Sequence, residues 1–102
     1  MSNKVSEVVT TILEQLGGRK FQAMTGAHNM VAVDENTLSL KFKGSNKANY
    51  LQVRYVPATD LYTIEIGKVR GLKYDVVDIT NNAYADMLQR VFTKVTGLYT
   101  TI

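Results

Sequence analysis

The chain of 102 residues contains no cysteine, no tryptophan, a single proline and a single histidine. The absence of cysteine excludes disulfides, thiolate-bound zinc and cysteine nucleophiles together. One histidine cannot form a histidine-rich metal site within one chain. One proline argues against long disordered linkers. We therefore expect no metal and no cofactor.

Long apolar runs are also absent, since none approaches the ~18 residues of a membrane-spanning helix. The first residues, MSNKVSEVV, lack the basic-then-apolar layout of a signal peptide. These absences predict no membrane partner and a cytoplasmic location, in a bacterium or in a virus-infected cell. The length predicts a single domain over residues 1–102 with one hydrophobic core.

Apolar residues near the N-terminus recur at the spacing of an amphipathic helix. The pattern predicts a helix over about residues 3–16. Gly17 and Gly18 should end it, because glycine adopts the left-handed conformation of a helix C-terminus without a side-chain clash. The apolar stripe consists of Val5, Val8, Val9, Ile12, Leu13 and Leu16.

The same spacing returns near the C-terminus. Asn81 or Asn82 is expected to cap this second helix, and Gly97 is expected to end it. Its stripe consists of Tyr84, Met87, Leu88, Val91, Phe92 and Val95. Each helix has one apolar stripe, so both helices must lie on an apolar surface.

Between the helices the apolar period changes to two residues, which is typical of strands with one buried face. Turn-forming residues separate the alternating segments. Residues 21–33 should add one or two short strands. The alternating segments are TLSLKFK (37–43), YLQVRYV (50–56), LYTIEIGKV (61–69) and, more weakly, LKYDVVDI (72–79).

The order of these elements indicates an α+β fold in two layers. An antiparallel meander of three to five strands should be flanked by the N-terminal and C-terminal helices, both packed on one face. The other face of the sheet is then left to water or to a partner.

The segment FQAMTGAHNMV, residues 21–31, contains the only histidine, and a loop there could suggest chemistry. A general base needs a partner that orients it, yet His28 has no acidic neighbour before Asp34. We interpret residues 25–27 as a turn and His28 as a surface or capping residue.

Paired carboxylates are poorly supported as well. Asp34 and Glu35 are adjacent and are expected to form a turn between strands. The three-residue spacing of Asp75 and Asp78 puts them on opposite faces of a regular strand. With no catalytic arrangement in view, we predict no catalytic residues and no enzymatic activity.

Basic residues give the candidate binding positions, in a chain whose net charge is +3. The first group, Lys41, Lys43 and Arg54, shares an outward strand face, with Lys47 in the connecting loop, and should form one cationic patch. The second group, Lys68, Arg70 and Lys73, surrounds Gly71. Such cations can contact phosphate or an acidic protein, or they can simply keep an exposed sheet soluble. The candidates are Lys41, Lys43 and Arg54, then Lys68, Arg70 and Lys73.

Three segments, FQAMTGAHNMV, LYTIEIGKVRG and YADMLQRVFTKVTGLYT, resemble a family of small uncharacterised proteins encoded by bacteriophages and prophages. The resemblance extends from about residue 16 to the end and contains no catalytic motif. It implies a viral protein made in the bacterial cytoplasm, and it assigns no catalytic residue.

These observations predict a non-enzymatic interaction protein that binds a host or phage protein, with a host-modulating or anti-defence role. It would use the open sheet face or an edge strand. The alternative is an accessory nucleic-acid-binding protein that uses a basic sheet face. Formation of a homo-oligomer is compatible with both hypotheses.

Overall fold

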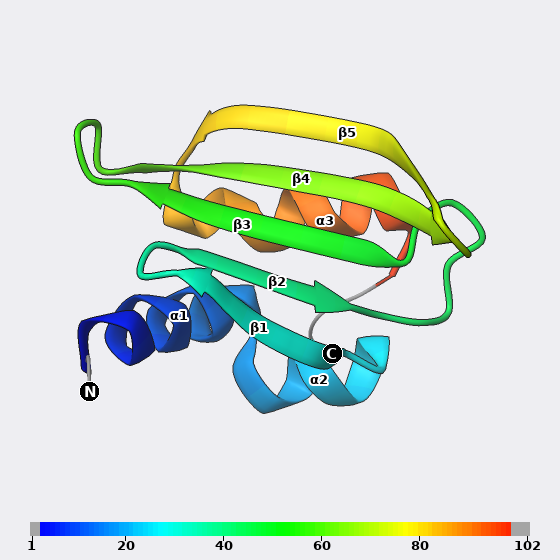
Figure 1. The fold of residues 1–102 in the computed structure, drawn as a ribbon, viewed down its shortest axis with the longest axis horizontal. Helices are drawn as coiled ribbons and strands as arrows, with labels where there is room; N and C mark the ends of the chain where they lie inside the picture. Colours follow the sequence, from blue (N-terminus) through cyan, green and yellow to red (C-terminus); the bar gives the residue numbers. More distant parts are fainter. Residues whose placement is uncertain (1–2, 99–102) are drawn as a thin grey trace.

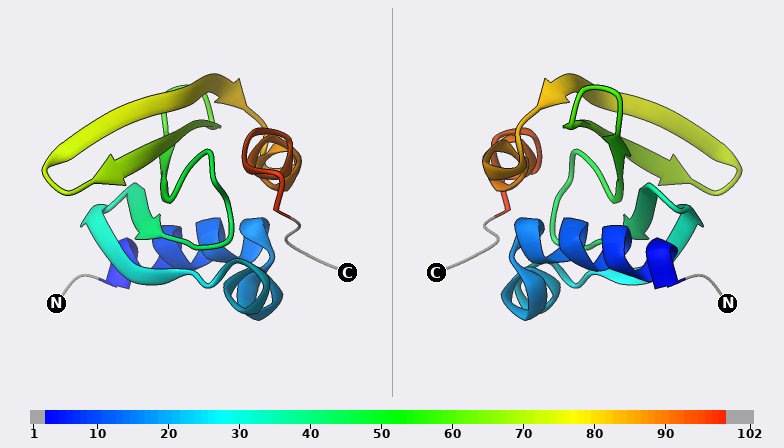
Figure 2. Two further views of the ribbon diagram at one scale, coloured as in Figure 1. Left: turned by 90° about the vertical axis from the view of Figure 1, so that its right-hand side faces the viewer. Right: turned by 90° about the vertical axis from the view of Figure 1, so that its left-hand side faces the viewer.

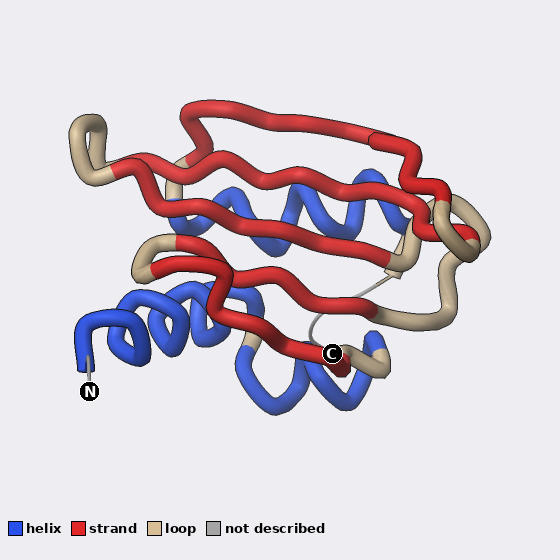
Figure 3. Tube along the Cα trace, in the orientation of Figure 1, coloured by secondary structure: helices blue, strands red, loops and turns tan. Residues whose placement is uncertain are grey.

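A computed structural model describes the backbone of residues 3–98 and the side chains of residues 7–98 (Figure 1). Loops connect the strands at the two ends of the sheet (Figure 3). In chain order the elements are α1 (Asn3–Leu16), α2 (Gly18–Thr25), β1 (His28–Asp34), β2 (Thr37–Lys41), β3 (Tyr50–Val56), β4 (Leu61–Arg70), β5 (Lys73–Ala83), the 3₁₀ helix η1 (Ala85–Met87) and α3 (Leu88–Thr96).

The five strands form one antiparallel sheet in the order β1-β2-β3-β4-β5. The sheet curves around α1 and α3, which lie on its concave side (Figure 2). Helix α1 contacts β1 and β2, and α3 contacts β4 and β5. The predicted two-layer α+β meander, with its terminal helices on one face, is confirmed.

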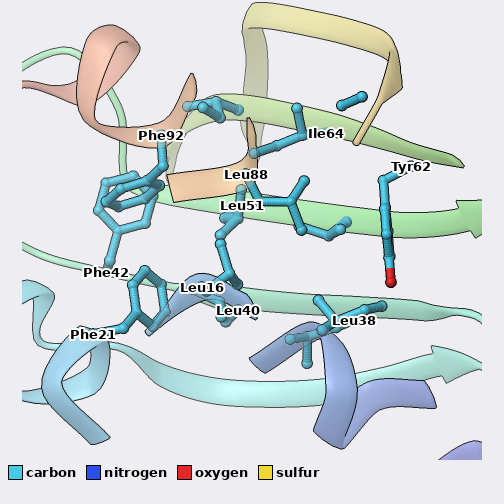
Figure 4. Packing of buried hydrophobic residues seen from close by; sticks show 14 of the residues in the cluster. Leu16, Phe21, Leu38, Leu40, Phe42, Leu51, Tyr62, Ile64, Leu88 and Phe92 are labelled. Carbon is cyan, nitrogen blue, oxygen red and sulfur yellow. The ribbon is translucent and has the colours of Figure 1, made fainter. Parts of the chain in front are cut away.

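The core lies between the helices and the concave face (Figure 4). The period-two pattern predicted this face, because alternate residues of β2, β3 and β4 point inward. Phe92 of α3 contacts Phe21 of α2 and Phe42 after β2, with ring centroids 5.3 and 4.9 Å apart. The inward residues of the three strands are Leu38, Leu40, Leu51, Val53, Tyr62, Ile64 and Ile66.

Helix α1 confirms the first predicted helix, with Ile12 and Leu16 fully buried. The side chain of Val5 lies outside the described residues. The glycines end α1, but a second helix, α2, begins at Gly18 and occupies residues where we had expected strands. Tertiary contact explains the difference, since α2 buries Phe21 in the core. The expected strand is confirmed only from His28 onward.

The C-terminal helix begins later than predicted. Asn81 and Asn82 lie within β5 and do not cap a helix, so that prediction is wrong. The chain first forms η1 and then α3, and Tyr84 is 62% exposed instead of joining the buried stripe. The predicted end is confirmed, because Gly97 is left-handed and its N–H donates to the Thr93 carbonyl at 2.8 Å.

The weakest predicted strand, β5, is in fact 11 residues long. Its register against β4 shifts between the pairs Ile66–Asp78 and Gly67–Val76, so β5 contains one extra residue there. Asp75, paired with Lys68, therefore lies on the same side of the sheet as Asp78, because Lys68 and Ile66 share a side. The prediction that the two carboxylates lie on opposite faces is wrong, since it assumed a regular strand.

Candidate interaction surface

The convex side of the sheet has no helix packed on it in the described part of the chain (Figure 2). We call this side the open face. Strand pairing aligns its residues in rows across the sheet. The central row consists of Val31, Ser39, Gln52, Glu65 and Ile79. One neighbouring row consists of His28, Lys41, Tyr50, Gly67 and Val76. The other neighbouring row consists of Asp34, Thr37, Arg54 and Thr63.

Exposed apolar side chains border the open face along both outer strands. On β5, Val76, Val77 and Ile79 are each between 42% and 51% exposed, and on β1 Val31 is 52% exposed. Scattered exposed apolar residues are normal, but contiguous ones mark interaction surfaces. The sequence pattern of β5 showed these residues, yet it did not show that β5 would lie at an edge.

A hydrogen-bonded aromatic cluster occupies the open face beside β5. The ring of Tyr74 lies directly over Gly67, where an added Cβ would come within 2.3 Å of a ring carbon. Its hydroxyl donates to Glu65 Oε2 at 2.7 Å, and its ring meets Tyr50 edge-on with centroids 5.2 Å apart. Burial first, and then the Glu65 carboxylate, raise the pKa of Tyr74 far above its usual value. Tyr50 in turn donates to Gln52 Oε1 at 3.0 Å.

His28 begins β1 beside Lys41 and is half-buried. Its Nδ1 lies 2.8 Å from the carbonyl oxygen of Gly26, the left-handed residue that ends α2. Among the described residues no carboxylate hydrogen-bonds to the ring. Residues 25–27 do reverse the chain, as predicted, but they do so at the end of a helix that the prediction did not include.

Asp34 lies at the far end of β1, in the predicted turn. Its Oδ1 accepts a hydrogen bond from the Asn36 backbone N–H at 2.8 Å. That bond, with the Thr37 hydroxyl and the charge of Arg54, lowers the pKa of Asp34. The turn predicted at Asp34 and Glu35 is confirmed.

The first cationic group does not form a single patch. Lys41 lies opposite Tyr50, whereas Arg54 lies opposite Thr37, four residues further along β3. That separation is about 13 Å along the strand. Lys43 has left β2, and its backbone N–H donates to the Thr25 carbonyl at 2.7 Å. The prediction failed because it considered the face of each residue but not its position along the strand.

Five of the six candidate cations nevertheless lie at one end of the sheet. Tyr50 pairs with Lys41 of β2 and with Gly67 of β4, and the chain beyond Gly67 carries Lys68, Arg70 and Lys73 at that same end. We call this the basic end. Lys68, Arg70 and Lys73 lie on the opposite side of the sheet from Lys41, so no single flat face presents all of them. Lys68 also lies opposite Asp75. The basic end consists of Lys41, Lys43, Lys68, Arg70 and Lys73.

A shallow depression of about 310 Å³ lies between α1 and the turn that joins β3 to β4. Glu7 and Thr11 line one side, and Tyr55, Asp60 and Tyr62 line the other. Tyr55 donates to Asp60 Oδ1 at 2.5 Å, and this bond is the main cause of the raised pKa of Tyr55. The described residues contain no group of three or more His, Asp or Glu placed to hold a metal ion.

Comparison with protein-family models, curated proteins and solved structures finds no match to this chain. Phage origin therefore stays a hypothesis that rests on the three sequence segments alone. In the described part of the chain, no helix has the length and apolar character needed to cross a membrane.

Proposed function

We propose that this chain is a non-enzymatic interaction protein and that it binds a host or phage protein through the open face. The observation that carries the proposal is the one-sided cover of the sheet, which leaves a face bordered by exposed Val31, Val76 and Ile79. Tyrosines are enriched in protein interfaces, and the ordered pair Tyr50 and Tyr74 supplies large rigid surfaces beside these aliphatic residues.

The resemblance to phage-encoded proteins supports a partner from the infected bacterial cell. A small protein that binds a host enzyme or defence factor can modulate it without any catalysis of its own. The proposed role is therefore host modulation or anti-defence activity in the bacterial cytoplasm.

Substitutions on the open face test this proposal. Ile79→Asp and Val31→Asp each introduce a charge into the central row at a position that is at least half exposed. Ala58→Asp, in the exposed turn after β3, is the matched control. Proteins captured from phage-infected cells, with nuclease present, should be lost with the two face variants and retained with the control. Equal capture by all three folded variants would contradict the proposal.

Nucleic-acid binding is the second candidate, and the observation that favours it is the basic end. Counterion release predicts a slope of about −0.9 in log affinity against log salt for each phosphate contact on duplex DNA. Replacing Lys41, Lys43 and Lys68 by Gln should flatten the slope by up to about 2.7 if each contacts a phosphate. Arg54→Gln, at the other end of the sheet, is the control.

We expect no specific nucleic-acid binding at physiological salt, because the net charge is only +3 and the cations lie on two sides of the sheet. Sub-micromolar, salt-sensitive binding that the triple variant loses and Arg54→Gln keeps would establish the second candidate instead.

A further inference from the structure

The outer edge of β5 offers a strand for pairing. β5 is the last strand of the sheet, and Lys73–Val76 pairs without interruption with Gly67–Arg70 on its inner side. Among the described residues, no backbone hydrogen bond other than those of the ladder with β4 reaches residues 73–76. An edge strand with free N–H and C=O groups is a template for another strand.

The other edge strand, β1, is less suited to pairing. It has 7 residues, with register shifts between His28 and Val31 and between Ala32 and Asp34. Asn29 has a φ of 50°, which interrupts an extended edge. These irregularities blunt the β1 edge in the way that proteins commonly prevent edge-to-edge pairing, whereas residues 73–76 have no such interruption.

The sequence around Tyr74 is complementary to itself when it is read in the antiparallel direction. Leu72 and Val76 are both apolar and exposed, and Lys73 and Asp75 have opposite charges. Residues directly opposite in an antiparallel pair share a face, and a two-fold axis normal to the sheet pairs one residue with its own copy. We infer that a second copy of this chain pairs with β5 about a two-fold axis at Tyr74.

This register joins two identical sheets into one continuous sheet. Lys73 lies opposite Asp75 of the second copy, and the same pair forms again across the axis. Leu72, in the turn that precedes β5, is the residue that continues this register opposite Val76 of the second copy. Opposite charges and apolar pairs in facing positions both stabilise antiparallel strands.

Other two-fold registers along the same edge are worse. An axis at Asp75 or Asp78 puts two carboxylates directly opposite each other. An axis at Val76 puts Asp75 opposite Val77 and Lys73 opposite Ile79. An axis at Val77 puts Asp75 opposite Ile79. Only the axis at Tyr74 puts Lys73 opposite a carboxylate of β5, so the charge pattern favours this axis.

The conformation of Tyr74 is compatible with this arrangement. Its ring points inward over Gly67 and donates to Glu65, so it does not project beyond the edge. The two Tyr74 rings of a dimer would lie over their own sheets, and the two backbones can approach to pairing distance.

Charge exchange tests the register. Positions 73 and 75 of the two copies face each other twice in the dimer, once on each side of the axis. Lys73→Asp puts two carboxylates opposite each other at both of these places, and Asp75→Lys puts two ammonium groups there. Each variant alone should weaken dimerisation by about tenfold in sedimentation equilibrium. An equimolar mixture of the two, or the double variant Lys73→Asp/Asp75→Lys, should restore the affinity because opposite charges face each other again.

A wild-type chain that stays monomeric at about 1 mM, where even a weak interaction of about 4 kcal/mol is detectable, would overturn the inference. So would single variants without effect, or a mixture that fails to restore the dimer. Capture of a partner by the open face is measured separately, so a negative result here leaves the proposed function standing.

Because the chain has no cysteine, a single introduced thiol reports the axis directly. Facing residues have Cα atoms about 4.5–5.5 Å apart, within the range of a disulfide. Oxidation of Tyr74→Cys should therefore give a covalent dimer. Ile79 is more exposed than Tyr74, at 50% against 41%, but has no β5 residue opposite it in this register, so Ile79→Cys should stay monomeric. Equal cross-linking of both variants would contradict the two-fold axis at Tyr74.

Discussion

The two faces of the sheet come from the same strands, yet they differ in composition and burial. Over β2, β3 and the part of β4 up to Ile66, the concave face consists of aliphatic and aromatic side chains that the helices bury almost fully. The open face combines single charges, amides and tyrosines with exposed aliphatic residues on the outer strands. Strand alternation separates the two sets of side chains. Only the position of the helices decides which apolar residues are covered and which stay exposed. Substitutions can test this difference at matched positions.

The largest effect is expected at Phe92, where three helix and loop segments meet the sheet. Phe92→Ala should reduce the free energy of unfolding by about 3–5 kcal/mol, since it removes a fully buried ring that contacts Phe21 and Phe42. Leu88→Ala, also fully buried, should lower it by about 2–5 kcal/mol. Urea denaturation measures both. Tyr84→Ala is the exposed control, and a loss at Phe92 no larger than at Tyr84 would contradict the core.

A pair of isoleucines compares the two faces directly. Ile64 is fully buried on the concave face of β4, and Ile79 is half exposed on the open face of β5. Ile64→Ala should lower the free energy of unfolding by about 2–5 kcal/mol. Ile79→Ala should lower the free energy of unfolding by less than about 1 kcal/mol, because the substitution removes little buried apolar surface. Similar losses in dilute monomeric protein would show that the open face is covered.

Gly67→Ala tests the aromatic cluster. The added methyl group would overlap the Tyr74 ring, which must swing away and lose its bond to Glu65. We expect a loss of about 1–2 kcal/mol, from the displaced ring and the broken hydrogen bond. The same substitution in a Tyr74→Ala background should have a smaller effect, and a double-mutant cycle measures the difference. Equal effects in both backgrounds would mean that the ring does not lie over Gly67.

The smallest effect is expected at His28. Its ring hydrogen-bonds only to the Gly26 carbonyl among the described residues. His28→Ala should change the free energy of unfolding by less than about 1 kcal/mol, because an exposed hydrogen bond contributes little net stability. Partner capture should be unchanged. Loss of capture without a change in Tm would assign His28 to the binding surface.

The local pattern of the sequence was sufficient to predict the fold class, the face of the sheet that the helices cover and most of the turns. Apolar spacing located α1, the end of α3 and the inward residues of β2, β3 and β4, because these elements follow regular periods that packing then uses. The turn at Asp34 and the glycine that ends α3 were also predictable, since they depend on local backbone conformation.

Only the tertiary structure decided the features that depend on contacts distant in sequence. Helix α2 forms where Phe21 can reach Phe92, and β5 extends through Asn82 because β4 is there to pair with it. Register placed Arg54 far from Lys41, and one extra residue in β5 brought Asp75 and Asp78 to one side. Periodicity determines which face a residue takes, whereas its neighbours along and across the sheet depend on strand register, which distant segments set.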